Sequence, residues 1–395
     1  MGEFTGQPLE AGVLPDGIRS GFVDGVNGLR MHLLEAGFDD ADPRARPCVL
    51  LLHGFPELAY SWRKIMVSLA AAGFHVIAPD QRGYGRTTGG QAQDPSGPAP
   101  YRLLNLVRDA IGLVSALGYP SVAAVVGHDF GASVAAWCAL LRPDVFRTMV
   151  LMSAPFAGPP QLPFKIAGSA DENPAAPDIH QALAALPRPR KHYQWYYATA
   201  QAAADMDAAP QGLQDFLRAY YHHKSADWAG NRPFPLTDWT AAELQKLPTY
   251  YVMDLEETMP QAVAHEMPPA ESVAANRWLP DHELRVYVGE FSRTGFQAAL
   301  QWYRNLTDPQ LSAELQIWSG CTIDVPSCFI AGSSDWGIHQ RPGALDRMRL
   351  QACSRMSAVH LVDGAGHWVQ QERPAEVTAL LLAFLQRHRQ ESGGV

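Results

Sequence analysis

The 395-residue chain lacks several features that define whole classes of protein. Its five cysteines are scattered and form no CxxC pair, so neither a disulfide framework nor a cysteine zinc site is expected. No apolar run approaches the roughly 20 residues that cross a membrane, and residues 1–17 contain no apolar stretch typical of a secretory signal. These absences predict a soluble protein of the reducing cytoplasm.

Positive charge is also scarce. Lys and Arg number 31 against 40 Asp and Glu, which gives a formal net charge of −9, and no basic run is present. Such a chain repels polyanions, so nucleic acid and anionic membrane surfaces are excluded as expected partners. At 47% hydrophobic residues the chain nevertheless has ample material for a large core.

Short apolar runs alternate with helix-period segments at both ends of the chain. The runs predicted as buried strands are 48–55, 75–80, 121–128 and 148–155, then 324–332 and 358–364. Amphipathic helices are predicted over 62–74, 103–118, 131–143 and 374–388. Strand–helix alternation of this kind predicts an α/β fold with a mostly parallel, doubly wound sheet.

The pattern changes between the two strand-bearing parts. A Pro- and Gly-rich entry, 158–191, is predicted to run over the surface, and a mostly helical stretch without a convincing buried strand follows. Thr240 and Thr294 each precede a pattern expected to open a helix with a capping box. We therefore predict one catalytic core, 1–156 with 323–395, interrupted by a helical cap over 157–322.

The strongest local motif is Gly-His-Asp-Phe-Gly, 127–131, between a predicted strand and a predicted helix. Small residues on both sides of a central nucleophile allow the sharp strand-to-helix turn called the nucleophile elbow. Here Asp129 takes the seat that Ser holds in esterases. A carboxylate is a weak acyl nucleophile, but it attacks a strained sp³ carbon and forms an alkyl ester that water must then hydrolyse.

Hydrolysis of that ester needs a base, an orienting acid and an oxyanion hole. His367 follows the last predicted strand between glycine and tryptophan, and Asp335 follows the strand before it, which matches the chain order nucleophile, acid, histidine. The backbone N–H groups of Phe55 and Phe130 are expected to form the oxyanion hole. The pair His222–His223 has no partner at ligand spacing and is predicted to be solvated.

Six spaced motifs together resemble the α/β-hydrolase superfamily, and more narrowly its soluble-type epoxide hydrolases. They are HGFPE (53–57), SWR (61–63), APDQRGYGRT (78–87), GHDFGAS (127–133), SSDWG (333–337) and GAGHW (364–368). One departure is Phe130, where members often have tryptophan; it bears on the shape of the pocket, since catalysis needs only the backbone N–H there. The resemblance implies hydrolysis of an epoxide to a vicinal diol without cofactor or metal.

The resemblance also implies two tyrosines on the cap that donate protons to the epoxide oxygen. The segment around Tyr303 is similar to the one that holds the second tyrosine, and Tyr193 lies in a segment similar to the first. Tyr196 and Tyr197 are alternatives to Tyr193. For all of them, packing in the core of the cap is the competing interpretation.

Other functions stay open at this stage. A haloalkane or haloacid dehalogenase would use the same Asp-His-Asp triad with indole N–H donors, and Trp195 and Trp302 are nearby in the sequence. A non-catalytic binding protein of this fold is a further alternative, whereas a serine esterase is disfavoured because no serine occupies an elbow. The aromatic cap segments favour a bulky, apolar epoxide, and the oligomeric state is not readable.

Overall fold

The computed structural model describes residues 6–39, 42, 45–89, 97–162 and 178–392. Part of the predicted surface excursion, 163–177, lies outside these described residues. In the part of the chain that the model describes, no helix is both long and apolar enough to cross a bilayer.

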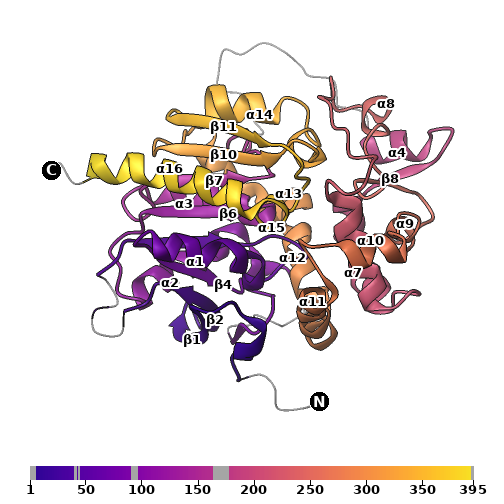
Figure 1. Ribbon diagram of the computed structural model, residues 1–395. Helices are drawn as coiled ribbons and strands as arrows, with labels where there is room; N and C mark the ends of the chain where they lie inside the picture. The colour runs from indigo at the N-terminus through magenta and orange to yellow at the C-terminus, as the bar shows by residue number, and fades with distance from the viewer. Residues whose placement is uncertain (1–5, 40–41, 43–44, 90–96, 163–177, 393–395) are drawn as a thin grey trace, which may run out of the picture.

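A single twisted sheet forms the centre of the molecule (Figure 1). Its strands run in the order β1-β2-β4-β3-β6-β7-β10-β11, and the short β5 pairs with β2. The bounds are β1 Ile18–Val26, β2 Leu29–Ala36, β3 Cys48–Leu52, β4 His75–Pro79, β5 Thr88–Gly89, β6 Ala124–His128, β7 Met149–Met152, β10 Ser327–Gly332 and β11 Met356–Val362. From β4 to β11 along this order the neighbours are parallel, as the alternating pattern predicts.

The two antiparallel strands β1 and β2 are absent from the sequence-based prediction. They carry polar residues that are uncommon in buried strands, and the structure shows why these are tolerated. His32 of β2 is buried with its Nδ1 2.7 Å from Asp80 Oδ2, and Glu35 Oε1 lies 2.6 Å from His75 Nε2. These pairs satisfy the polar groups of His32 and Glu35. The same polar residues interrupt the apolar pattern by which a buried strand is recognised in the sequence.

Helices cover both faces of the sheet (Figure 1). On one face lie α1 (Arg63–Ala71) and the long α16 (Pro374–Ser392), which share a buried cluster with the strands. On the other face lie α2 (Leu103–Ala116) and α3 (Phe130–Leu141). This is the doubly wound arrangement that the sequence predicts, and two covered faces explain why the parallel strands are apolar throughout.

A largely helical block of chain joins β7 to β10. Its helices are α4 Ile179–Ala184, α5 Tyr193–Tyr197, α6 Gln201–Asp207, α7 Leu213–Lys224, α8 Ala241–Leu244, α9 Met259–Ala264, α10 Ala270–Ala275, α11 Asp281–Thr294, α12 Gln297–Thr307 and α13 Pro309–Ser312. The block also contains a two-stranded sheet, β8 (Arg190–His192) with β9 (Val252–Asp254), which the sequence does not predict. Strands of three residues are too short for a recognisable period.

One predicted capping box is wrong. Thr294 is the last residue of α11, where its hydroxyl donates to the carbonyl of Glu290, and α12 begins only at Gln297. Thr240, in contrast, caps α8 by accepting from the backbone N–H of Glu243, but the Glu243 carboxylate accepts the N–H of Thr237, so only half of the predicted box forms. The same four-residue pattern therefore fits both a helix start and a helix end.

The helical block packs directly on the sheet-bearing part of the chain. Trp302 of α12 donates its indole N–H to the carbonyl of Arg82 over 3.0 Å, and Tyr221 of α7 donates its hydroxyl to the carbonyl of Pro56 over 2.9 Å. One continuous hydrophobic cluster includes side chains from α2, α3 and the block. The two parts thus share a core at the edge where the parallel strands end.

Candidate active site

The turn around Asp129 has the backbone geometry of an elbow. β6 ends at His128, α3 begins at Phe130, and Asp129 between them has φ 52° and ψ −120°, a region that non-glycine residues rarely adopt. A Cβ atom on Gly131 would lie 2.2 Å from the carbonyl oxygen of Leu52, so only glycine fits there. The strained turn presents the Asp129 side chain at the end of the sheet.

The structure brings Asp129, His367 and Asp335 together from the ends of three strands. His367 follows β11 and its Nε2 lies 3.3 Å from Asp129 Oδ2, while its Nδ1 lies 3.1 Å from Asp335 Oδ1. Asp335 follows β10 and accepts the backbone N–H of Gly337 over 2.7 Å. All three side chains are buried, so their interactions are poorly screened by water.

Both acids are held in the ionised form. Burial alone would raise the pKa of Asp129, but the neighbouring His367 and the charge of Lys224 hold this pKa well below its ordinary value. Burial likewise opposes ionisation of Asp335, and the charge and hydrogen bond of His367 outweigh it, so the pKa of Asp335 is lowered as well. A carboxylate nucleophile and an orienting carboxylate are both present at neutral pH.

One carboxylate oxygen of Asp129 already lies at a backbone donor. The N–H of Phe55 donates to Asp129 Oδ1 over 3.1 Å. Phe130 is the first residue of α3, so its N–H has no acceptor within the helix. Gly54 allows this approach, because a Cβ there would lie 2.5 Å from the Asp129 side chain. The two predicted oxyanion donors thus stand on either side of the nucleophile candidate.

A cavity of about 340 Å³ opens in front of Asp129. Its wall includes aromatic and aliphatic side chains from both the sheet-bearing part and the helical block, namely Phe130, Trp137, Phe156, Trp302, Leu306 and Leu315. Tyr193 and Tyr303 belong to the same wall. Asp129 is therefore enclosed by an apolar chamber in which neutral oxygen donors face a charged nucleophile.

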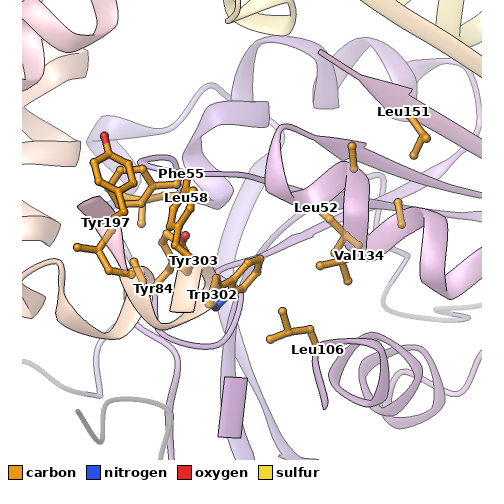
Figure 2. Packing of buried hydrophobic residues seen from close by; sticks show 14 of the residues in the cluster. Leu52, Phe55, Leu58, Tyr84, Leu106, Val134, Leu151, Tyr197, Trp302 and Tyr303 are labelled. Carbon is orange, nitrogen blue, oxygen red and sulfur yellow. The ribbon is translucent and has the colours of Figure 1, made fainter. Parts of the chain in front are cut away.

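The two tyrosines are anchored by packing. The Tyr303 ring meets Phe55 and Tyr197 edge-on at 5.6 Å and 4.9 Å between centroids, and Figure 2 shows these three side chains close together. The Tyr193 hydroxyl donates to Gln340 Oε1 over 3.2 Å. Burial, with the charge of Asp129 next in importance, raises the pKa of both tyrosines well above the ordinary value, so both remain protonated donors.

The alternatives to Tyr193 are engaged elsewhere. Tyr196 donates its hydroxyl to Asp205 Oδ2 over 2.7 Å, and Tyr197 donates to the hydroxyl of Tyr220 over 3.2 Å. Neither is among the described residues that line the cavity. Tyr193 shares that wall with Asp129, which favours it over both neighbours.

Neither tryptophan that the sequence analysis named as a dehalogenase donor is placed for that role. Trp302 lines the cavity, but its N–H is already bonded to the carbonyl of Arg82. Trp195 packs against His180 and His192 and is not among the described lining residues. The tyrosine hydroxyls are better placed as donors than either indole.

Lys224, at the end of α7, is a buried cation that the sequence analysis missed. Its Nζ lies 5.1 Å from the ring centroid of Tyr251 and 5.4 Å from that of Trp368, and its backbone carbonyl accepts the N–H of His367 over 2.9 Å. Its positive charge acts on the carboxylate of Asp129. A lysine on an amphipathic helix normally reaches solvent, so no sequence signal marked it.

The neighbouring histidine corrects a prediction. His223 is fully buried between Trp228 and Tyr250, with ring centroids 4.4 Å and 4.7 Å away, so it is not solvated. Burial lowers the pKa of His223 to about 3, which keeps it neutral. His222 is only half-buried. The two adjacent residues therefore have different surroundings on α7, which the sequence pair alone does not reveal.

A second buried ion pair supports the loop of His367. Glu57 Oε2 lies 2.5 Å from His128 Nδ1, and His128 Nε2 donates to the backbone carbonyl of His367 over 2.7 Å. Burial opposes both charges, but each partner outweighs it: the pKa of Glu57 is lowered and that of His128 is raised. Glu57 and His128 both lie inside motifs quoted in the sequence analysis. A titratable side chain beside apolar residues was the sequence signal that could have identified them.

Comparisons with known proteins agree with this architecture. Residues 47–374 match the family model described as alpha/beta hydrolase fold. The chain is 35% identical to epoxide hydrolase A of Mycobacterium tuberculosis, with 91% of this chain and 95% of the relative covered. It is 31% identical to epoxide hydrolase 3 of Siraitia grosvenorii, with 92% and 96% covered.

Solved structures give the same result. An epoxide hydrolase from an endophytic Streptomyces superposes with a TM-score of 0.73 at 32% identity, covering 95% of this chain and 97% of the other. Potato (Solanum tuberosum) epoxide hydrolase I superposes with a TM-score of 0.69 at 30% identity, covering 94% and 99%. The likeness thus extends over the sheet, the helical block and the site between them.

Proposed function

The chain belongs to the α/β-hydrolase fold family and is an epoxide hydrolase, and from that premise we propose that Asp129 is its nucleophile. In the first step Asp129 Oδ2 attacks a ring carbon of the epoxide, the carbon–oxygen bond breaks, and Tyr193 or Tyr303 gives its proton to the departing oxygen. The product of this step is an alkyl ester of the enzyme.

In the second step water hydrolyses the ester. His367, oriented by Asp335, removes a proton from water as its oxygen attacks the ester carbonyl, and the N–H groups of Phe55 and Phe130 stabilise the oxyanion. Collapse releases the vicinal diol. The water oxygen stays on Asp129, and the two protons of water end on the diol oxygen released from the ester and on the tyrosine. The balance needs no further reactant.

The observation that carries this proposal is the position of the Asp129 carboxylate. Its Oδ1 accepts from the Phe55 N–H and its Oδ2 lies 3.3 Å from His367 Nε2. One oxygen is therefore in the oxyanion position and the other lies beside His367, while Asp129 lines the cavity whose wall includes the two tyrosines. The same carboxylate can attack in the first step and be attacked in the second.

The finer features of the proposal concern domains, substrate and compartment. We assign 1–156 with 323–395 to the catalytic core and 157–322 to a cap that supplies the proton donors. The apolar, aromatic wall of the cavity supports a bulky epoxide as substrate. Five free cysteines, of which Cys321 is exposed, support a reducing cytoplasm.

The covalent step is tested with His367→Gln. This variant keeps the nucleophile and the proton donors but lacks the base, so we expect the protein to gain the mass of one epoxide, with the adduct mapped to the Asp129 peptide. The matched control is the double variant Asp129→Asn/His367→Gln. It lacks the nucleophile, so any adduct that it gains measures non-specific alkylation of other residues. An unmodified single variant, or equal adducts in both, would contradict Asp129 as nucleophile.

A further inference from the structure

Lys224 is a buried cation whose ammonium group has no acceptor in the described part of the structure. The residue is 3% exposed, and its Nζ forms neither a hydrogen bond nor an ion pair with any described residue. Four aromatic rings surround the charge instead, with centroids 5.1 to 5.7 Å from Nζ: those of Tyr220, Tyr250, Tyr251 and Trp368. Ring faces attract a cation, but they replace none of the hydrogen bonds that water gives to an ammonium group.

Packing alone does not account for a lysine at this position. Methionine has a side chain of similar length, packs well against aromatic rings and carries no charge to desolvate. Burial opposes the charge of Lys224 and lowers its pKa, while the carboxylates of Asp129, Asp335 and Glu57 act in the opposite direction. The negative charges of the site are therefore what favours an ionised lysine among these rings.

Esterification of Asp129 changes the charges that surround Lys224. Glu57 forms an ion pair with His128, so the charges of these two largely cancel. Of the carboxylates that act on Lys224, this leaves Asp129 and Asp335. The cation thus faces two negative charges before the reaction and one in the alkyl-enzyme, so esterification removes part of the attraction that stabilises the buried ammonium group.

Lys224 is also fixed beside the loop that contains His367. Its backbone carbonyl accepts the N–H of His367 over 2.9 Å. A Cβ atom on Gly366 would lie 2.6 Å from the same carbonyl oxygen, so the end of α7 and this loop are packed without free space. The charge of Lys224 therefore stays within range of Asp129 during both chemical steps.

The proposed reaction moves negative charge away from Asp129 and then back to it. As the ester bond forms and the ring carbon–oxygen bond breaks, the charge passes through the ring oxygen to the tyrosine that protonates it. The proton donors Tyr193 and Tyr303 are not among the described rings around the Lys224 ammonium group, so this transfer takes the charge away from the cation. Attack of water on the ester carbonyl then creates an oxyanion on Asp129, and cleavage of the ester leaves its carboxylate.

We propose that Lys224 sets the balance between the two steps, slowing attack by Asp129 on the epoxide and speeding hydrolysis of the resulting ester. The proposal rests on the proposed function, because Asp129 must lose and regain its charge. A cation stabilises the charged nucleophile before the first step and the oxyanion during the second, where it adds to the N–H groups of Phe55 and Phe130. Lys224 thus acts through Asp129 and needs no contact with the substrate.

The test measures the two steps separately in single turnovers of a neutral aryl epoxide at pH 8, far above the lowered pKa of Asp129. Rapid quench and mass spectrometry follow the ester on the peptide that contains Asp129. In Lys224→Met we expect ester hydrolysis to be about tenfold slower, which corresponds to one pKa unit at the carboxylate. Ester formation should be about threefold faster, because only part of the charge has moved in that transition state. A change that affected packing alone would not move the two rates in opposite directions.

Two further variants separate charge from shape. Lys224→Arg keeps the charge and should leave both rates closer to wild type than methionine does. The matched control is Lys191→Met, which removes another lysine of the helical block that lies over a ring, 4.9 Å from the centroid of Tyr196. The acids that act on Lys191 are those around Glu256 and not Asp129, so this variant should keep both wild-type rates.

The possible results distinguish this inference from the proposed function. Unchanged rates, or slower or absent ester formation, in Lys224→Met would overturn the role of Lys224. An equally large opposite change in Lys224→Arg or Lys191→Met would overturn it as well. In each case the wild type would still form the Asp129 ester. Absence of that ester from both the wild type and His367→Gln would instead contradict the proposed function.

Discussion

The two halves of the proposed active site are held by different forces. The sheet half, Asp129, Asp335 and His367, stands on the ends of β6, β10 and β11 and is linked by charges and hydrogen bonds. The helical half, Tyr193 and Tyr303 on α5 and α12, is held mainly by contacts between aromatic rings.

Burial acts on both halves in the same direction, towards the neutral form, yet their protonation differs. In the sheet half the interactions with His367, and for Asp129 also the charge of Lys224, outweigh burial, so the pKa values of Asp129 and Asp335 are lowered. In the helical half the negative charge of Asp129 adds to burial, and the pKa values of the two tyrosines rise. One carboxylate thus stays charged and keeps its proton donors neutral, which is what ring opening requires.

If the comparison holds, damage to Asp335 or His367 in the sheet half slows ester hydrolysis, and damage to the helical half slows ester formation. The largest effect expected of a single residue that does not touch the substrate is that of Asp335→Asn. Loss of the orienting charge should lower kcat about 10³- to 10⁴-fold. Rapid-quench experiments should show the alkyl-enzyme forming quickly and then persisting. An equal slowing of both steps would break the distinction between the halves.

Tyr303→Phe tests the other half and should lower the rate of ester formation about 100-fold, because one general acid is lost. No alkyl-enzyme should accumulate, since the later step is untouched. The matched control is Tyr197→Phe, which removes a neighbouring hydroxyl bonded to Tyr220 and outside the described cavity wall. A comparable loss in the control would indicate that packing and not proton donation is being measured.

Lys224→Met tests whether the charge of Lys224 helps to keep Asp129 ionised. The cation lowers the pKa of Asp129, so its removal must raise that pKa, and the acid limb of kcat/KM should move to higher pH. A move of one pH unit corresponds to a tenfold lower rate on that limb. Lys224→Arg, which keeps the charge, should move the limb less. An unshifted profile for the methionine variant would show that His367 alone keeps Asp129 ionised.

The smallest effect on activity is expected for Glu372→Gln, which acts on stability. Glu372 accepts the backbone N–H groups of Ala226, Gly366 and Trp368 and so fixes the loop of His367. Burial nevertheless raises the pKa of Glu372 to about 7. Because the folded-state pKa exceeds the unfolded value, the stability this group contributes is present at low pH and is lost as pH rises towards and through 7.

The neutral glutamine has no such dependence. In urea unfolding, the stability of Glu372→Gln relative to wild type should therefore improve between pH 5 and pH 8. Glu376→Gln, an exposed acid in the first turn of the following helix α16, provides the control and should show no such trend. A relative stability of Glu372→Gln that stays constant with pH would mean that the carboxylate keeps its ordinary pKa in the folded protein.

The sheet half was the more predictable of the two from sequence. Asp129, Asp335 and His367 each follow an apolar run, and the ends of parallel strands meet at one edge, so order along the chain places them together. In the helical half, aromatic residues at helical spacing serve both packing and catalysis, and Tyr193, Tyr196 and Tyr197 cannot be told apart by spacing. Their partners in the folded structure distinguish them.

The features missed share a physical cause. The buried pairs of β2 with its neighbours, the pair Glu57–His128 and the cation Lys224 all place charge inside the protein. Each is stabilised by a partner distant in sequence, so local pattern assigns it to the surface. Hydrophobic periodicity therefore cannot predict a buried charge that is stabilised by a distant partner, and only the folded structure shows it.

The central claim, a covalent ester on Asp129, is tested most directly by the fate of the water oxygen. Wild-type enzyme in molar excess over a neutral aryl epoxide should complete a single turnover in ¹⁸O-labelled water. The account predicts an unlabelled diol and a peptide containing Asp129 that is heavier by one ¹⁸O, since water attacks the ester carbonyl. Labelled diol from that first turnover, with an unlabelled Asp129 peptide, would show that water attacks the epoxide directly and would contradict the account.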